Sequence, residues 1–508
     1  MIGNALGRPR FRVTPAGGSC HASDRHARWE VRDMDTDVLV VGAGLSGLSA
    51  ADALAAVGRD VVVWEARDRV GGRTLTEDVD GAAVDLGAQW LGPTQWRMHG
   101  LVQRFGLATF PTHTTGRSVL VDGDRRRTYR GTVPLLGPLQ LGRMALGLTT
   151  FRRLARQADR ADHRPGATQA PIAPMGAPDG RADRADHRPG ATQAPIAPMG
   201  AVDDRTLATV LDGPLGDGTA RAVVDAAIRV IFGADPGELS ADWVAAYAAA
   251  AGGDLLDLAA VDGGAQQTRL VSGTQAISTR LAEGLDVRLG REVVEVRHDD
   301  DGVTVRAASG ETIRAAHLVM AVPTPLVDTI TFDPPLPPAR LAVQRRMPMG
   351  ATAKVVATHD EPFWRADGLT GEAVLTDGPV QVVFDNTSAD GSVPALLAFV
   401  TGSPAHVAAR GTEEELHDAA VEAMVRAFGP RAAAPTRIVS KQWVHERFTG
   451  GCPVANLAPG AAMHAAALTR PVGRIRWAGT ETATEWTGYM EGAVAAGRRA
   501  ARDIVAGR

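Results

Sequence analysis

Residues 37–54 read DVLVVGAGLSGLSAADAL, and this stretch decides the fold. A continuous apolar run ends at Gly42, and a helical pattern of small and apolar residues begins after Gly44. Glycines at 42, 44 and 47 suit a tight turn, a close approach of the main chain to a pyrophosphate, and close packing of helix on strand. The pattern predicts a dinucleotide-binding unit in which Gly42, Ala43, Gly44, Ser46 and Gly47 bind the cofactor.

A second apolar strand is predicted at 60–65 and ends in Glu65. Glu65 follows Gly47 by 18 residues, close to the roughly 20 expected for a carboxylate that accepts a hydrogen bond from a ribose hydroxyl. A glycine-rich turn alone is weak evidence, but strand, helix and acidic residue together favour a bound dinucleotide over an empty turn.

The composition favours a small-molecule partner. The 508-residue chain has a net charge of -4, so it has no excess of positive charge to attract nucleic acid. Its 44% apolar residues are enough to form a large hydrophobic core. No stretch approaches the roughly 18 apolar residues of a membrane-spanning helix. With Cys20 and Cys452 as its two cysteines and no leader-like segment, the chain is expected in the cytoplasm.

Strands and helices alternate along the chain, which indicates an α/β (α+β) enzyme. Strands are predicted at 293–307, 317–322 and 353–358, and helices at 275–285 and 413–429. Two segments stand apart. Residues 1–34 are expected to be a disordered extension, with Met34 the natural start. A 20-residue string at 158–177 recurs unchanged at 182–201, which is typical of a tandem-duplicated surface loop and not of a solenoid.

The run from Glu65 to Arg73 has the form ExRxRxGGR, and with further motifs it resembles the flavin-containing amine oxidase superfamily, in particular its monoamine oxidase branch. The resemblance extends from Met34 to the C-terminus. The other motifs are VDLGAQWLGPTQ (84–95), GGAQQTR (263–269), DPPLPP (333–338), EPFW (361–364), TGGCPV (449–454) and AGTETATEWTGYMEGAV (478–494).

The resemblance implies FAD as the cofactor and an interleaved architecture. A Rossmann-like FAD-binding domain would consist of 35–112, 268–343 and 448–508, and a mixed-sheet and helical substrate domain of 113–267 and 344–447. Arg67 and Arg73 would lie along the FAD phosphates, where guanidinium groups form charge-assisted hydrogen bonds. Further FAD contacts are implied for Ala88, Gln89, Trp90, Val293, Trp443, Thr480, Glu481 and Met490. No metal site is expected.

Lys354 and Cys452 stand out because their residue types are rare here. Lys354 and Lys441 are the two lysines among 54 basic residues, and Lys354 matches the family lysine that holds a water near flavin N5. Its alternative interpretation is a strand lysine that extends to solvent. Cys452 matches the cysteine that in one family branch attaches the flavin through a thioether. Its alternative is a packed apolar side chain.

Tyr489 and Gln266 are the residues that the resemblance places at the substrate. The family pairs the tyrosine of GYMEG with a second tyrosine directly after the cysteine, but this chain has Pro453 there. Half of the aromatic cage is therefore missing, which leaves the identity of the amine open.

The activity implied is oxidation of an amine to an imine, then aldehyde and ammonia or amine, with reduction of oxygen to hydrogen peroxide. An L-amino-acid oxidase is a rival, although its arginine after the DLGA turn is replaced by Gln89 and Trp90. A polyamine oxidase is another, and a non-catalytic flavin-binding scaffold represents a different class. The expected partners are a small amine and oxygen, with a homodimer common in the family. The absence of an apolar C-terminal tail predicts a soluble enzyme.

Overall fold

The computed structural model describes residues 34–134, 136–162, 205–253 and 255–507. The predicted N-terminal extension up to residue 33, and residues 163–201 of the repeated segment, lie outside these ranges. Within the described residues no helix combines the length and apolarity needed to cross a bilayer.

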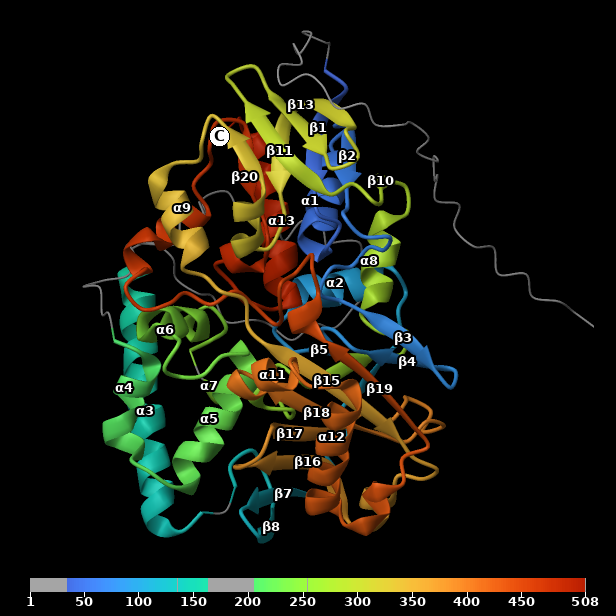
Figure 1. The fold of residues 1–508 in the computed structure, drawn as a ribbon, viewed down its shortest axis with the longest axis vertical. Coiled ribbons are helices and arrows are strands. Elements are labelled where there is room, and N and C mark those ends of the chain that lie inside the picture. The colour runs from blue at the N-terminus through green and yellow to red at the C-terminus, as the bar shows by residue number, and fades with distance from the viewer. Residues whose placement is uncertain (1–33, 135, 163–204, 254, 508) are drawn as a thin grey trace, which may run out of the picture.

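One eight-stranded sheet contains the predicted dinucleotide unit and occupies the upper part of Figure 1. Its core strands pair in parallel, as expected where a helix connects consecutive strands. In spatial order the strands are β10 (Asp286–Arg288), β2 (Val61–Trp64), β1 (Thr36–Val41), β13 (Thr312–Met320), β12 (Val303–Ala307), β11 (Val293–His298) and β14 (Thr331–Asp333), with β20 (Ile475–Trp477) also paired to β13.

A seven-stranded sheet forms the lower right of Figure 1. Its central strands are buried along their whole length and belong to a separate apolar cluster. In order they are β19 (Arg437–Gln442), β15 (Thr352–Thr358), β18 (Ala395–Thr401), β17 (Val380–Asp385), β16 (Leu369–Leu375), β7 (Arg117–Asp122) and β8 (Arg125–Tyr129). There are two further small sheets: β3 (Thr76–Val79) with β4 (Ala82–Asp85), and β5 (Trp90–Leu91) with β9 (Thr268–Leu270) and β6 (Thr109–Pro111).

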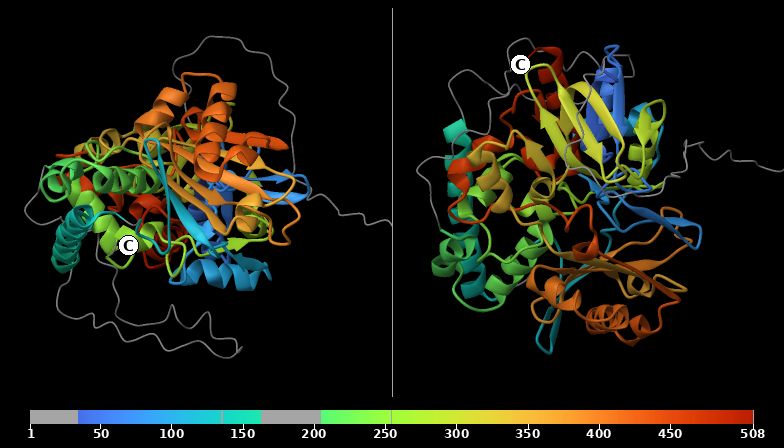
Figure 2. Two further views of the ribbon diagram at one scale, coloured as in Figure 1. Left: turned by 90° about the horizontal axis from the view of Figure 1, so that it is seen from below. Right: turned by 45° about the horizontal axis from the view of Figure 1, so that its top comes forward.

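The helices fall into three groups, visible in Figures 1 and 2. Helices α1 (Leu45–Ala55) and α13 (Met490–Val505) cross closely beside the first sheet because Gly497 has no side chain: a Cβ there would lie 2.0 Å from Ser46 O. The first group also contains α2 (Trp96–Arg104), α8 (Gln275–Ala282) and α9 (Pro338–Arg345). The second contains α3 (Pro138–Asp162), α4 (Leu207–Leu215), α5 (Thr219–Phe232), α6 (Ala241–Ala249) and α7 (Leu255–Ala259), and the third, on the second sheet, α10 (Phe363–Ala366), α11 (Ser403–Ala408) and α12 (Glu413–Phe428).

The mixed α/β class is confirmed, and so are the predicted strands at 60–65, 317–322 and 353–358 and both predicted helices, within a few residues at their ends. The single strand predicted at 293–307 is wrong. It is a hairpin of β11 and β12, because Asp299 accepts hydrogen bonds from the main chain of Asp301 and Gly302 and so closes a turn. A DDDG sequence inside an apolar alternation was the available turn signal.

Candidate active site

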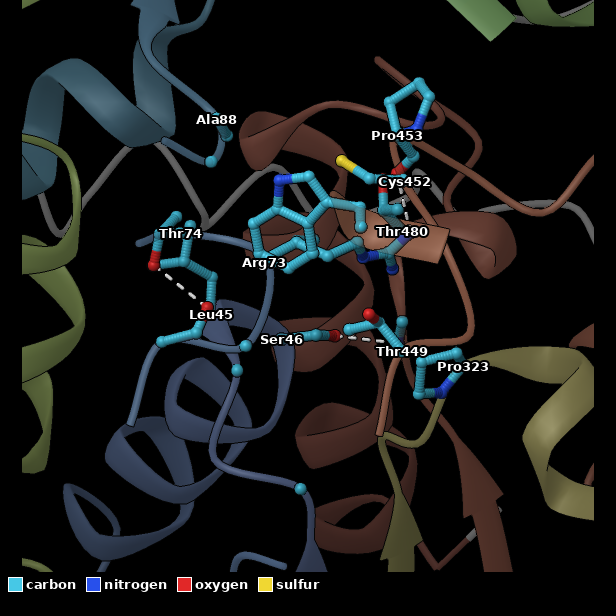
Figure 3. Close-up of a pocket in the computed structure, with 18 of the residues that line it drawn as sticks. Leu45, Ser46, Arg73, Thr74, Ala88, Pro323, Thr449, Cys452, Pro453 and Thr480 are labelled. Carbon is cyan, nitrogen blue, oxygen red and sulfur yellow. Dashed lines mark hydrogen bonds between the residues drawn. The ribbon is translucent and has the colours of Figure 1, made fainter. Parts of the chain in front are cut away.

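A cavity of about 440 Å³ lies where the two large sheets approach each other, within the size range of cofactor pockets. Its walls come from segments far apart in the chain: the turn before α1, the end of β2, strands β15 and β18, and the turns before α13. Figure 3 looks into it, with Leu45 and Ser46 on one side, Cys452 and Thr480 on the other, and Arg73 between them.

The glycine turn is shaped by three different demands. Gly42 has φ +103, and a Cβ there would lie 3.0 Å from Ala321 O. A Cβ on Gly47 would lie 1.9 Å from Gly42 O, so helix and strand pack at a distance that excludes any side chain. Gly44 differs: a Cβ there would have only Gly72 Cα near it, at 3.9 Å, and Gly44 faces the cavity. Gly42 and Gly47 are therefore required by the backbone conformation and the packing, although Gly42 also lines the cavity, whereas Gly44 keeps the cavity open.

Two helix N-termini face the cavity. Helix α1 follows Gly44 and helix α13 follows Tyr489, and neither has a side-chain cap. The first main-chain N–H groups of a helix lack intrahelical partners and carry partial positive charge, so both ends favour an anionic ligand. Ser46 Oγ accepts a hydrogen bond from Gly479 N–H (2.8 Å), which ties the start of α1 to the turn that carries Thr480.

Glu65 is buried at the end of β2 and lines the cavity. Its Oε2 accepts from Ala43 N–H (2.7 Å) and its Oε1 from Arg67 N–H (3.1 Å), which fixes the carboxylate beside the glycine turn. The Arg67 guanidinium also lines the cavity and pairs with Glu446 (3.2 Å). The first predicted carboxylate and the first predicted arginine are therefore neighbours.

Arg73 and Glu481 form a buried ion pair below the cavity wall. Arg73 Nη1 donates to Glu481 Oε1 (2.7 Å) and to Pro453 O (2.7 Å). Burial opposes ionisation of Glu481, but Arg73 outweighs it and lowers the pKa of the Glu481 carboxyl. Arg73 lines the cavity, whereas Glu481 does not. Glu481 therefore affects the cavity by holding Arg73 in place.

Several buried polar atoms in the wall have no hydrogen-bond partner among the described residues. They include Trp64 Nε1 and Thr449 Oγ1 on the side of the glycine turn, and Trp90 Nε1 and Gln266 Oε1 on the side of β9. A buried donor or acceptor without a hydrogen-bond partner costs about 1–3 kcal/mol. These atoms therefore fit a cavity in which a polar ligand forms the missing hydrogen bonds. Open donors, a shaped glycine turn and uncapped helix ends together fit FAD.

Lys354 projects from the fully buried strand β15 into the cavity. Its Nζ donates to Asp85 O (2.9 Å), Gly87 O (2.8 Å) and Gln89 Oε1 (3.0 Å). Burial lowers the pKa of Lys354 to about 8, although Asp85 and Cys452 favour the charge. The alternative interpretation, a lysine that extends to solvent, is wrong because the side chain is 4% exposed.

Cys452 faces the cavity from the turn after η4 (Trp443–His445), and its sulfur points toward the centre of the labelled residues in Figure 3. Burial raises the pKa of the thiol to about 11, while Arg73 and Lys354 act in the opposite direction. Trp443 lines the same wall and is anchored by its Nε1, which donates to Leu86 O (2.9 Å).

The far end of the cavity is aromatic and apolar. Tyr489 Oη donates to Leu258 O (3.2 Å), and its ring lies between Trp486 (centroids 5.0 Å apart) and Tyr247 of α6 (6.0 Å). Burial raises the pKa of both tyrosines, so both remain neutral. Apolar residues complete this end: Val230, Ile231, Leu258, Ala265 and Phe399.

The structure brings most of the predicted residues to one cavity. Those that line it are Gly42, Gly44, Ser46, Glu65, Arg67, Arg73, Ala88, Gln89, Trp90, Gln266, Val293, Lys354, Trp443, Cys452, Thr480, Tyr489 and Met490. Ala43, Gly47 and Glu481 do not line it. Sequence reasoning missed Tyr247, whose available signal was that the chain has three tyrosines, and it missed the apolar residues of α5, which look like ordinary core.

Comparisons with known proteins agree with this site. Residues 45–505 match the family described as flavin containing amine oxidoreductase. The chain is 36% identical over 484 residues to the flavin-containing monoamine oxidase AofH of Mycobacterium tuberculosis, covering 92% of this chain and 96% of that protein. It is 33% identical over 476 residues to human flavin-containing amine oxidase B, covering 92% and 86%.

Two solved structures share the fold over nearly the whole chain. Putrescine oxidase with bound putrescine has a TM-score of 0.81 at 31% identity, covering 93% of this chain and 99% of that one. Cyclohexylamine oxidase from Brevibacterium oxydans has a TM-score of 0.82 at 30% identity, with the same coverage. The chain thus belongs to the flavin-containing amine oxidase family and is an FAD-dependent enzyme that oxidises amines.

Proposed function

We propose that the substrate is a monoamine with an apolar substituent. The enzyme removes two electrons and two protons from the amine to give an imine, and oxygen takes them up to give hydrogen peroxide. Water then hydrolyses the imine to an aldehyde or ketone and ammonia or a smaller amine. FAD, when bound, supplies the hydride acceptor and the reaction with oxygen.

The observation that carries the substrate class is the pairing of charges in the cavity wall. Apart from Lys354, each charged residue that lines the cavity has an oppositely charged partner among the described residues: Glu65 with Arg67, Arg67 with Glu446, Arg73 with Glu481, Arg291 with Glu311, and Arg447 with Glu292. The described residues that line the aromatic end carry no charge, so neither a second ammonium group nor a carboxylate finds a charged partner there.

This pairing argues against the two rival activities. A diamine such as putrescine carries a second ammonium, and burying it without a partner is costly. An amino acid carries a carboxylate that faces the same difficulty. Cyclohexylamine, the substrate named for one structural relative, has an apolar ring and one amine, which matches the aromatic and apolar end of this cavity.

Two side chains are proposed to orient the amine. Gln266 Oε1 lacks a described partner and faces the cavity, so it can accept a hydrogen bond from the amine N–H. Tyr489 would offer an aromatic face to the amine, and the rings of Trp486 and Tyr247 pack against the Tyr489 ring and restrict its rotation. An apolar wall disfavours the ammonium form of the substrate, which supports binding of the neutral amine.

The predicted FAD contacts are carried forward as proposals. Glu65 would accept from the ribose, the N-terminus of α1 and Arg67 would meet the pyrophosphate, and Thr480 and Met490 would lie along the flavin. Lys354 would sit beside the flavin ring. The common cavity and the uncapped ends of α1 and α13 support this arrangement.

A thioether between Cys452 and the flavin is also proposed. The sulfur faces the cavity, and Arg73 and Lys354 favour its thiolate, although burial disfavours it. Acid precipitation of the purified protein separates the cases: a yellow pellet supports the bond, and a yellow supernatant removes it. Cys452→Ser should then release all flavin to the supernatant.

We further propose the division into an FAD-binding domain of 35–112, 268–343 and 448–508 and a substrate domain of 113–267 and 344–447. The first large sheet takes its strands from the first set of segments and the second sheet from the other set, which supports the division. Cytoplasmic location and a homodimer stay proposals; light scattering of the purified enzyme tests the dimer.

The substrate proposal is tested by hydrogen peroxide release from an amine panel. We expect turnover of benzylamine, phenethylamine and cyclohexylamine, and at least about tenfold lower kcat/KM for putrescine, spermidine and L-amino acids, since an unpaired buried charge costs more than 1.4 kcal/mol. A preference for putrescine or for an L-amino acid would overturn it.

A further inference from the structure

The Lys354 ammonium has no free hydrogen in this structure. An ammonium group carries three donors and no acceptor, and Lys354 Nζ uses them on Asp85 O, Gly87 O and Gln89 Oε1, at 2.8 to 3.0 Å. Two of these acceptors are main-chain carbonyls that cannot turn away. Gln89 supplies the single side-chain acceptor, and it lines the cavity beside Lys354.

Gln89 is held from its other end. Its Nε2 donates to Asn386 Oδ1 at 2.6 Å, and both amides are 2% exposed. Since an ammonium can only donate, Gln89 must present its oxygen to Lys354 and its nitrogen to Asn386. The hydrogen bonds therefore run in one direction, from Lys354 through Gln89 to Asn386.

Asn386 is fixed in turn by its main chain at the end of β17. Its N–H donates to Ala395 O (2.7 Å), and the buried Arg269 donates to Asn386 O (3.3 Å) and Thr387 O (2.8 Å). The aromatic rings of Trp90 and Phe399 lie 5.5 and 5.3 Å from Lys354 Nζ and close the sides. These groups surround the ammonium, and Lys354 and Gln89 line the cavity side by side.

We propose that Gln89 is a positioning residue that, braced by Asn386, holds the Lys354 ammonium in its charged form and in a single orientation at the cavity wall. A water can bind this ammonium only by replacing Gln89. The proposal builds on the function proposed above, in which Lys354 stands beside the flavin ring. It assigns to Gln89 a task separate from cofactor contact.

The charged groups around Lys354 set the direction of the test. Burial opposes its charge, Asp85 and Cys452 favour the charge, and Arg269 opposes it. In Gln89→Leu the ammonium loses one acceptor, so its acid dissociation constant should rise about tenfold, the effect of one hydrogen bond to a charged group. In Gln89→Glu, which keeps the shape and adds negative charge, the constant should fall by about tenfold or more.

The composition of the chain makes this measurable in the full-length holoenzyme. With two lysines in the whole sequence, protein grown on lysine labelled with carbon-13 at Cε gives two NMR signals, and Lys354→Met identifies one of them. The pH titration of each signal reports its acid dissociation constant. Lys441 lies opposite Lys354 on β19 but pairs with Glu446 and not with Gln89, so it is the internal reference and should titrate nearly identically in the Gln89 variants.

The matched control is Gln95→Leu. Gln95 lies in the same segment as Gln89, is fully buried, and its side-chain amide has no hydrogen-bond partner among the described residues. It should leave the Lys354 titration unchanged. Where Gln89→Leu yields no folded holoenzyme, Gln89→Met, which has a similar volume and no strong acceptor, replaces it in the comparison with Gln89→Glu.

Opposite displacements of the Lys354 titration in Gln89→Leu and Gln89→Glu support the inference. Identical titrations in wild type and both variants overturn it, and so does a displacement of the same sign in both. These outcomes do not depend on turnover. An enzyme that ignores every amine in the panel refutes the proposed function and leaves this titration to decide the role of Gln89.

Discussion

The two ends of the cavity recognise their ligands by different means. At the glycine turn the wall consists of main-chain atoms, the uncapped start of α1 and charged side chains that are already paired. At the other end the wall is formed by side chains, among them those of Tyr489, Tyr247 and Ile231. One added side chain can therefore block ligand binding at the first end, whereas the ligand preference of the second end depends on the shapes of several side chains together.

The largest effect is expected from a side chain at the glycine turn. Gly44→Val should fold, because its Cβ meets only Gly72 Cα, but the side chain enters the cavity. We expect flavin content below about a tenth of wild type, because the pyrophosphate needs that close approach. Gly47→Val should instead prevent folding, since its Cβ would lie 1.9 Å from Gly42 O.

Absorbance of bound flavin and thermal unfolding separate these two outcomes. Gly100→Val on α2, where a Cβ has nothing within 4 Å, is the control for adding a side chain without a clash. Full flavin binding by Gly44→Val would contradict the account of the glycine turn.

Lys354 lies between the two ends, and its removal should have the next largest effect. Lys354→Met should slow flavin reoxidation by oxygen on the order of a hundredfold, the usual loss on removing one preorganised charge. Because burial lowers the pKa of Lys354 to about 8, the wild-type rate should be full below pH 8 and fall as the ammonium is lost above it.

Stopped-flow mixing of reduced enzyme with oxygen measures this step. Lys441→Met, the matched lysine on β19, should reoxidise at the wild-type rate. An unchanged rate in Lys354→Met would remove its proposed role.

The amine end should respond more weakly to single substitutions. Tyr489→Leu should lower kcat/KM for benzylamine about tenfold, because an aromatic face beside an amine contributes about 1 kcal/mol or somewhat more. Tyr489→Phe keeps the ring, loses the hydrogen bond to Leu258 O, and should stay within about threefold of wild type. Equal losses in both variants would show that the hydroxyl, and not the ring, matters.

The same contrast explains what the sequence could predict. The glycine turn, Glu65 and Arg67 lie within 26 residues of one another, and their task is encoded by local spacing, so the flavin end was predictable. Tyr247 and Ile231 reach the cavity from helices whose apolar patterns look like core. Gln89 and Asn386 meet across 297 residues, and no local pattern reports such a contact.

The last effect concerns stability, and not turnover, in the sheet that supports the amine end. Glu372 on β16 accepts from Ser118 Oγ (3.2 Å), and burial raises its pKa to about 7. The folded state therefore holds this proton between pH 4.5 and 7, where the unfolded chain has released it, so stability falls as pH rises through this window. Glu372→Gln cannot ionise, so it should lose about 1–3 kcal/mol less folding free energy than wild type between pH 4.5 and 7.

Chemical denaturation at pH 5 and pH 8 measures the difference. Wild type and Glu372→Gln should differ more at pH 8, with the variant the more stable. A difference that is equal at both pH values would show that Glu372 is ionised in the folded state throughout.

We expect an amine with a single amino group and an apolar body to reduce the flavin at this site. Anaerobic mixing of the holoenzyme with cyclohexylamine, benzylamine or putrescine, followed by the loss of oxidised-flavin absorbance, tests it without dependence on oxygen. We expect complete and rapid bleaching by cyclohexylamine and benzylamine and slow bleaching by putrescine. Faster bleaching by putrescine, or none by any amine, would contradict it.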